Sequence, residues 1–249
     1  MSNNKRKPAL AAGSVAFWIV FWHLAATLAN RKLILKIPLP LETAKAFIEN
    51  CASKDFWQVV GVSVLHILIG FVSGVVIGLI FGFLSEKYYF FRVFTSPVHH
   101  AIKTVPVAAL IIVAWLWIPS SLLPSFISFL MVLPIVWSHT SAGVSAIDRK
   151  LVEMAQVYSM KRRDILFKIK LPLVSPQVRT GCLTALGIAW KSGVAAEVIA
   201  SPTGSLGAIL NGAKTSINYP QVFAITLTVV LLSVLLEKIL KIVWREQKR

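Results

Sequence analysis

Apolar residues gather in long runs along this chain, and short polar segments separate the runs. A helix that crosses a bilayer needs about twenty predominantly apolar residues. Six segments come near this length, at 9–29, 59–84, 101–118, 122–140, 178–200 and 221–244. The pattern predicts an all-α, polytopic membrane protein with these segments as its transmembrane helices. Because no internal repeat or soluble region interrupts it, we expect residues 1–249 to form a single transmembrane domain.

Prolines fall inside two of these segments. Pro106 lies in 101–118, which is the shortest of them, and Pro124 and Pro134 lie in 122–140. Proline lacks a backbone N–H and clashes with the preceding turn of a helix. Irregular backbone is therefore expected in 122–140, where neighbouring helices can bond the freed carbonyl groups.

The chain is strongly basic as well as apolar. Its net charge is +16, while 56% of its residues are apolar and only 14% are charged. Such a charge is typical of nucleic-acid-binding proteins, but long apolar runs are not. A membrane protein with its basic residues on one side of the bilayer explains both the charge and the apolar runs. With a cytoplasmic N-terminus, 19 Lys and Arg residues lie inside and 6 outside. The positive-inside rule then predicts that both termini are cytoplasmic, and no nucleic-acid partner is needed.

Residues 148–172 form the longest predicted cytoplasmic connection, and they are poor in Pro, Gly and Ser. The Asp148 carboxylate can accept from the free backbone N–H groups of a helix that begins at Arg149. In this helix the apolar side chains recur with helical period at Leu151, Val152, Ala155 and Tyr158. The connection is therefore expected to be structured.

A second amphipathic stretch is predicted from 161 to 171, with a bend near Ser159 before it and Pro172 as its end. Two short helices across the cytoplasmic mouth would present an apolar surface rimmed by charge, which is typical of a protein docking site. The same pattern suits helices that lie in the lipid headgroup layer. The residues by themselves leave both interpretations open.

The connection resembles a known motif. Glu153-Met154-Ala155, Ser159, Ile169 and Leu171-Pro172 are similar to the "EAA…G…I-x-LP" loop of the permease subunits of binding-protein-dependent ABC importers. Met154 stands where that motif has alanine, and Ser159 where it has glycine. Glycine takes a positive φ at little cost, whereas serine does not, but Ser159 is able to N-cap the following helix.

The resemblance extends over most of the chain. Ile37-Pro38-Leu39-Pro40 before a short helix at 42–51, Thr104-Val105-Pro106, and Ala195-Ala196-Glu197 are similar to the nitrate/sulfonate/taurine-type branch. The resemblance implies a type I importer permease fold whose loop couples to a cytoplasmic ATPase. The implied coupling residues are Glu153, Ala155, Tyr158, Ser159 and Pro172.

The resemblance also implies a location in a bacterial-type cytoplasmic (inner) membrane, partners and a transport role. The expected partners are a second permease subunit in a homodimer, two cytoplasmic ATPase subunits, an extracytoplasmic solute-binding protein and the lipid bilayer. The chain has no G-x-x-x-x-G-K-[ST] phosphate-binding motif, so ATP and Mg²⁺ are expected on the partner ATPase, with no cofactor on this chain. The implied function is the passage of a small anionic or organic solute, not an enzymatic reaction.

Two charged residues lie inside the segment 178–200. Charges at such depth are costly and usually face a cavity or a partner, so Lys191 and Glu197 are candidates for the substrate pathway. Lys191 would favour an anion. The alternative is structural: a snorkelling lysine or an ion pair for Lys191, and a structural carboxylate for Glu197, which lies near the external end. Six positions apart, the two are not i,i+4 partners.

Small residues recur at every fourth position in two segments, at Gly70, Gly74, Gly78 and Gly82, and at Gly181, Ala185, Ala189 and Gly193. Such spacing lets helices approach closely, either for packing within the subunit or as a surface that slides during transport. The five histidines are scattered, and neither they nor the two cysteines suggest a metal site. A secondary carrier, which would more often show duplicated halves, and a membrane enzyme, which needs reactive groups, are the competing functions.

Overall fold

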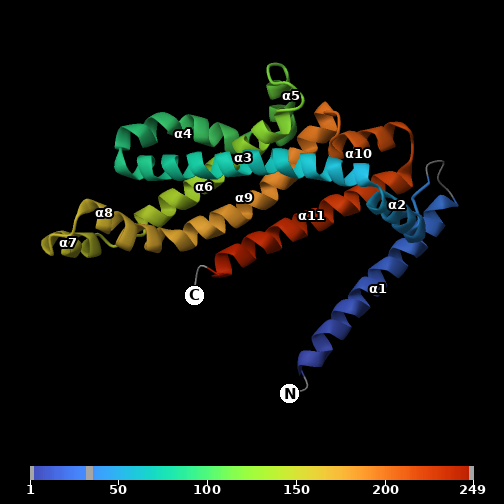
Figure 1. Cartoon of the computed structure of the whole chain (residues 1–249), viewed down its shortest axis with the longest axis horizontal. Helices are drawn as coiled ribbons and strands as arrows, with labels where there is room; N and C mark the ends of the chain where they lie inside the picture. Colours follow the sequence, from blue (N-terminus) through green and yellow to red (C-terminus); the bar gives the residue numbers. More distant parts are fainter. Residues whose placement is uncertain (1–2, 32–35, 247–249) are drawn as a thin grey trace. The chain divides into compact units, whose positions relative to one another are not determined.

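The computed structural model describes residues 3–31 and 36–246, and every element in these ranges is a helix (Figure 1). The elements are α1 Asn3–Asn30, α2 Pro40–Ala52, α3 Lys54–Lys87, α4 Tyr89–Thr104, α5 Val107–Trp115, α6 Leu123–Ser145, α7 Arg149–Val157, α8 Arg162–Asp164, the π-helix η1 Ile165–Lys170, α9 Leu171–Ala200, α10 Leu206–Thr215 and α11 Tyr219–Glu246. The predicted all-α class is confirmed. Three of the basic residues behind the predicted orientation, Lys32, Lys248 and Arg249, lie outside the described residues.

Five helical stretches are long and apolar enough to cross a membrane: Gly13–Asn30, Lys54–Lys87, Leu123–Ser145, Arg162–Ala200 and Tyr219–Trp244. The pair α4 and α5 passes the same test only when its two helices are taken together, and they are bent by 106° relative to each other. The chain is therefore a multi-pass membrane protein, with five such stretches among its described residues and a sixth if the bent pair forms one span.

The predicted span 101–118 is not a continuous helix. α4 already begins at Tyr89 and ends at Thr104, and α5 starts only at Val107. The break follows from Pro106, because the residue before a proline is pushed out of the helical region. That residue, Val105, has the extended angles φ −72° and ψ 133°.

The irregular backbone predicted for 122–140 is wrong, because α6 runs unbroken from Leu123 to Ser145. Pro124 lies in the first turn of α6, where its missing N–H has no intrahelical partner to lose. Pro134 is inside the helix and buried. A buried proline can be tolerated where packing from neighbouring helices holds the backbone in place.

The predicted end of the second loop helix at Pro172 is also wrong. Arg162–Ala200 forms one helical stretch of 39 residues, made of α8, η1 and α9. Pro172 lies in the first turn of α9, directly after η1, and Leu171 still donates its N–H to the Leu166 carbonyl. The fifth span is therefore continuous with the connection 148–172.

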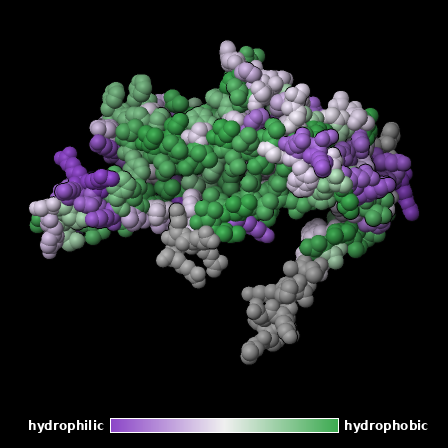
Figure 2. All heavy atoms as spheres, viewed as in Figure 1, coloured by the Kyte–Doolittle hydropathy of each residue, from purple (hydrophilic) through white to green (hydrophobic). Residues whose placement is uncertain are grey.

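Residues 59–208 and 232–249 form one compact unit. Its hydrophobic core includes buried side chains of α5, α6 and α9: Ile111, Leu123, Ile127, Met131, Ala196 and Ala200. On its outside, Figure 2 shows hydrophobic side chains over α3 and α4 and hydrophilic ones at the end that carries α7 and α8. Exposed apolar residues on α3, such as Leu65, Ile69 and Val76, are suited to face lipid.

The four-residue glycine series of α3 lies directly against α6. A Cβ atom added at Gly74 would lie 2.7 Å from Cβ of Val132, and one at Gly78 would lie 2.9 Å from Cβ of Val136. Gly70 meets Ser128 and Gly82 meets Thr140 in the same register. The absence of a side chain is thus what allows the two helices to touch, and the predicted packing within the subunit is confirmed.

Residues 1–58 and 209–231 form the second compact unit. The predicted short helix at 42–51 is confirmed as α2, and the Glu42 carboxylate caps it by accepting the Leu39 N–H at 3.0 Å. The side chain of Asn30 bonds both backbone groups of Ile37, at 2.7 Å and 2.9 Å. Gln221 on α11 donates to Asn50 on α2 at 2.8 Å, which ties the two helices together.

Candidate docking surface and polar sites

The first helix of the connection 148–172, α7, begins as the sequence predicts. The backbone N–H of Lys150 donates to Oδ1 of Asp148 at 2.9 Å, so Asp148 is the N-cap. This bond satisfies one of the free N–H groups at the helix start.

The predicted bend after α7 is confirmed, and its geometry explains the residue at its centre. Ser159 has φ +55°, in the left-handed region. Met160 donates its N–H to the Ala155 carbonyl at 3.0 Å, and Ser159 donates to the Gln156 carbonyl at 2.9 Å. These two bonds form a Schellman motif, in which glycine is the usual residue at the left-handed position. The N-cap of α8 is Lys161 and not Ser159, so the predicted capping role of Ser159 is wrong.

Ala155 does not belong to the exposed face of the connection. Its side chain is only 3% exposed, and α7 contacts η1, whose Ile165 is 5% exposed. The most exposed apolar side chains of α7 and its C-cap are Val157 at 82%, Tyr158 at 77% and Met154 at 53% exposed. The predicted apolar surface therefore exists, but Met154, Val157 and Tyr158 form it, and we name these three the loop surface.

The remaining predicted coupling residues border this surface or lie beyond it. Glu153 and Ser159 are exposed next to it in sequence, and Pro172 is exposed in the first turn of α9. Most basic side chains of the connection are also exposed: Arg149, Lys150, Lys161, Arg162, Arg163 and Lys168.

Glu197 is fully buried near the end of α9. Its Oε2 atom accepts a hydrogen bond from Oγ of Ser63 at 2.8 Å and from the backbone N–H of Gly207 at 3.1 Å. Oγ of Ser63 in turn accepts the N–H of Leu206 at 2.9 Å. The carboxylate thus joins α3 and α9 to the start of α10, where the helix dipole favours negative charge.

These contacts favour the structural interpretation of Glu197 over a place in the substrate pathway. Its side chain has no exposed surface, so a passing solute would not reach it in this conformation. Gly207 lies so close to Glu197 that a Cβ at this position would collide with the Glu197 side chain, and only glycine fits there. The sequence could not identify these partners, because Ser63 lies 134 positions away.

Lys191 has the opposite environment. It is exposed on α9, and among the described residues it forms no ion pair. Lys191 and Glu197 are not bonded to each other, as their spacing predicts. Lys191 therefore stays a candidate for the substrate pathway.

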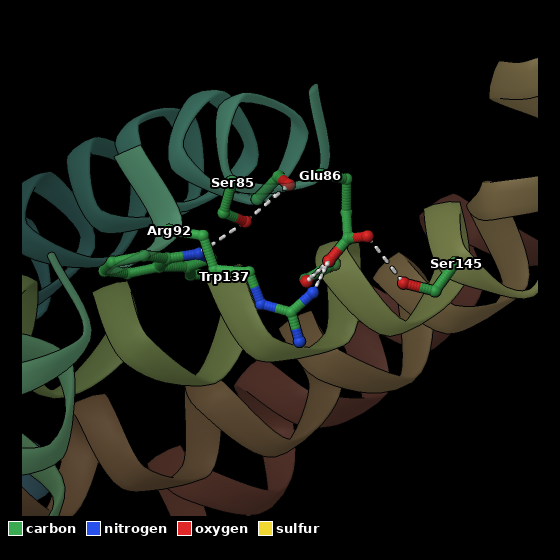
Figure 3. Close-up of polar contacts among 7 residues, drawn as sticks. Ser85, Glu86, Arg92, Trp137 and Ser145 are labelled. Atoms are coloured by element: carbon green, nitrogen blue, oxygen red, sulfur yellow. Dashed lines mark hydrogen bonds and ion pairs between the residues drawn. The ribbon is translucent and has the colours of Figure 1, made fainter. Parts of the chain in front are cut away.

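A polar cluster that the sequence analysis missed lies where α3, α4 and α6 meet (Figure 3). Glu86 accepts hydrogen bonds from the hydroxyl groups of Ser141 and of Ser145, the latter at 2.8 Å. Nη1 of Arg92 lies 3.8 Å from Oε1 of Glu86. Figure 3 shows the Glu86 carboxylate between Arg92 and Ser145, so one carboxylate holds side chains from two other helices.

A neighbouring hydrogen bond also joins side chains of α3 and α6. The indole N–H of Trp137 on α6 donates to Oγ of Ser85 on α3 at 3.0 Å. A sequence signal existed, because an acidic residue at the end of an apolar run and serines at helical spacing in 138–145 are polar groups that need partners. The pairing itself spans more than fifty residues and is set by the fold.

A cavity of about 360 Å³ links this cluster to the connection 148–172. Its polar lining comes from Glu86 and Ser145 on one side, and from Arg149 and Lys170 on the other. Glu86 therefore lies where the helical core meets the start of α7 and the end of η1.

Comparison with known proteins agrees with this architecture. Residues 74–248 match the family described as "Binding-protein-dependent transport system inner membrane component". The taurine transport system permease protein TauC of Escherichia coli (strain K12) is 26% identical, over 93% of this chain and 86% of TauC. The riboflavin transport system permease protein RibX of Chloroflexus aurantiacus is 29% identical, over 89% of this chain and 85% of RibX.

A solved structure has the same fold. It is a bacterial alginate ABC transporter in complex with an alginate pentasaccharide-bound periplasmic protein, and the aligned chain has a TM-score of 0.53 at 15% identity, over 95% of this chain and 93% of that one. At this identity the likeness concerns the fold. The relatives are transport components and not enzymes. Taken with the helical core and the structured loop, these matches show that the chain belongs to the inner-membrane permease subunits of binding-protein-dependent ABC importers, in their nitrate/sulfonate/taurine-type branch.

Proposed function

We propose that this chain forms the translocation pathway of an ATP-driven importer and that the loop surface docks on a separate ATPase subunit. The observation that carries the proposal is the outward-facing group Met154, Val157 and Tyr158, held by a capped and tightly closed helix. Large apolar side chains exposed on a connecting segment, with a polar rim, are typical of a protein interface. A partner that covers these side chains removes their apolar surface from water, which stabilises the complex.

The helical stretch Arg162–Ala200 supports a coupling role for this surface. It leads without a break from the loop into the fifth span. A displacement of the docked loop would therefore move a rigid element that passes through the core of the permease. Ala155 is buried and packs α7 against η1, so a movement of α7 would also move η1.

The other parts of the importer follow from this assignment. ATP and Mg²⁺ are bound by two partner ATPase subunits, and a second copy of this chain completes the pathway. An extracytoplasmic binding protein delivers a small solute, which is anionic or organic. The distribution of Lys and Arg supports an orientation in which the docking loop and both termini are cytoplasmic.

The loop surface is tested by the variant Tyr158→Asp in the full importer. A carboxylate placed in a closed protein interface has no partner and carries a desolvation cost of several kcal/mol. We expect normal membrane abundance, loss of the co-purifying ATPase and loss of solute uptake. ATPase retention is measured by affinity purification of the tagged permease.

Gln156→Asp is the matched control, because it adds the same charge on α7 at an exposed polar position on the opposite face of the helix. It should keep the ATPase bound. Wild-type ATPase retention in Tyr158→Asp would mean that the loop lies in the headgroup layer, and a secondary carrier would become the better assignment.

A further inference from the structure

Glu86 lines one cavity and bonds a residue that lines another, and basic side chains line both. The cavity of about 260 Å³ between α4 and α6 is lined by Arg92 and by Ser141, which donates to Glu86. The cavity of about 360 Å³ is lined by Glu86 itself, by Arg149 of α7 and by Lys170 of η1. One carboxylate therefore has two sets of cations around it, one on α4 and one on the connection that carries the loop surface.

The present pairing of Glu86 with Arg92 is loose. Nη1 of Arg92 lies 3.8 Å from Oε1 of Glu86, and the Arg92 side chain is 63% exposed. An exposed ion pair at this distance contributes little, so Arg92 can be released to solvent at a small cost. The hydroxyl groups of Ser141 and Ser145 would still hold the carboxylate on α6.

Arg149 and Lys170 are the cations that lack a counter-ion. Neither of them forms an ion pair within the part of the chain that the structure describes. Arg149 is the first residue of α7, whose first turn contains no acidic residue. A positive charge there is unfavourable, because the helix dipole is itself positive at the N-terminus. The N-cap Asp148 offsets part of this charge, and a second carboxylate near the start of α7 would stabilise it further.

Both cations belong to the elements that a docked partner would displace. The loop surface lies on α7, and the buried Ala155 packs α7 against η1, whose last residue is Lys170. A force on α7 would therefore move Arg149 and Lys170 together. The cavity that they share with Glu86 is the space in which this movement can take place.

We infer that Glu86 is a positioning residue for the coupling of the importer. When the docked ATPase moves α7 and η1 toward the helical core, the Glu86 carboxylate releases Arg92 and pairs with Arg149 and Lys170 through charge-assisted hydrogen bonds. Ser141 and Ser145 keep the carboxylate on α6 during this exchange, so the new ion pairs hold the displaced connection against the core. The inference rests on the proposed function, because it names the residue that links the docked loop to the spans.

ATP hydrolysis by the assembled importer in phosphatidylcholine nanodiscs tests this role, with ATP as the only added substrate. Glu86→Gln keeps an oxygen acceptor for the two serines and removes the charge. Its kcat should fall roughly tenfold, which is a typical size for a coupling between sites, because the displaced state loses its ion pairs. Its KM for ATP should stay at the wild-type value, because ATP binds to another subunit.

A double-mutant cycle separates coupling from a merely structural role. Arg149→Gln combined with Lys170→Gln should lower kcat as far as Glu86→Gln does, and all three substitutions together should lower it no further, because they remove one shared interaction. Arg149→Lys combined with Lys170→Arg keeps both charges and should retain the wild-type kcat. An unchanged kcat in Glu86→Gln would overturn the inference, and so would a triple variant in which the separate losses multiply.

Lys150→Gln combined with Lys161→Gln is the matched control. It removes two positive charges from exposed positions of the connection that do not line the cavity. It should hydrolyse ATP like the wild type, and a loss equal to that of Arg149→Gln with Lys170→Gln would contradict the assigned pairing. Every variant of this series should retain the co-purifying ATPase, and its loss from Glu86→Gln would also contradict the assignment. Docking is measured by ATPase retention in Tyr158→Asp and the role of Glu86 by ATP turnover, so the two failures are distinguishable.

Discussion

The two ends of α3 each meet a carboxylate, and the two carboxylates are held in opposite ways. Near the start of the helix, Glu197 is fully buried and bonds one hydroxyl group and one backbone N–H. At the other end, Glu86 bonds only side chains, and its own side chain is 14% exposed. Two cavities adjoin Glu86 or its partners.

This difference indicates which end of α3 is able to rearrange. A backbone N–H cannot turn away from Glu197 unless α10 itself moves, whereas Arg92, Ser141 and Ser145 can change rotamer. Water in the adjoining cavities can also take over a bond that is lost. We therefore expect structural rigidity at the Glu197 end and adjustable contacts at the Glu86 end, which shares a cavity with residues of the connection 148–172.

Glu197→Ala should have the largest effect on stability. It removes the acceptor for Ser63 and Gly207 and leaves a void where α3, α9 and α10 meet. The expected loss is about 3 kcal/mol in the free energy of unfolding, measured by thermal unfolding of the full chain in mild detergent.

The two controls sharpen the comparison. Glu197→Gln keeps an oxygen acceptor in place and should cost far less than the alanine variant. Glu86→Ala, at the other end of α3, should lower stability by only about 1 kcal/mol, because water can replace its partners. Equal losses for the two alanine variants would contradict the assigned difference between the ends.

Gly74→Ala tests the contact that runs between the two ends. The new methyl group would lie 2.7 Å from Cβ of Val132, so the helices would have to separate, at an expected cost of about 2 kcal/mol. Gly61→Ala is the matched control on the same helix, because nothing lies within 4 Å of its added Cβ. It should be neutral or stabilising, since alanine favours the helix more than glycine does. Equal destabilisation of both variants would show that close approach is not what requires Gly74.

The smallest effect is expected for the pair Glu86 and Arg92. The Arg92 side chain is 63% exposed and its Nη1 lies 3.8 Å from the carboxylate. Exposed ion pairs of this kind contribute little. A double-mutant cycle with Glu86→Gln and Arg92→Gln should give a coupling energy below about 1 kcal/mol in thermal unfolding. A clearly larger coupling would mean that this end of α3 is as firmly held as the other.

Local signals in the sequence predicted much of this fold. Apolar length identified the spans, and Asp148 and Ser159 marked the start and end of α7. The prolines were harder to interpret, because the chemistry of Pro106 and Pro134 is identical. Pro134 lies buried within α6, whereas Pro106 is exposed between α4 and α5. Only the packing of neighbouring helices distinguishes the two, and periodicity does not record it.

The candidate sites show the same limit. Periodicity placed Ala155 and Tyr158 in one helix, yet η1, which buries one of them, lies several residues further on. The partners of Glu197 and Glu86 come from helices far away in the chain. Such contacts depend on the register between helices, and a single sequence carries no direct signal for it.

The four-residue spacing of the α3 glycines has a consequence for that register. The opposing residues on α6, Ser128, Val132, Val136 and Thr140, repeat with the same period. A slip of one repeat, about 6 Å along the axis, would still place three of the four glycines opposite a partner. Shape alone therefore distinguishes poorly between neighbouring alignments of the two helices.

The polar bonds between the same helices have no such repeat. Ser125 donates to the His66 carbonyl at 2.8 Å, Trp137 to Ser85 at 3.0 Å and Ser145 to Glu86 at 2.8 Å. A slipped alignment would break all three at once. Each bond adds little to the packing strength, but together they make one alignment of α3 and α6 unique among alignments that would otherwise be nearly degenerate in energy.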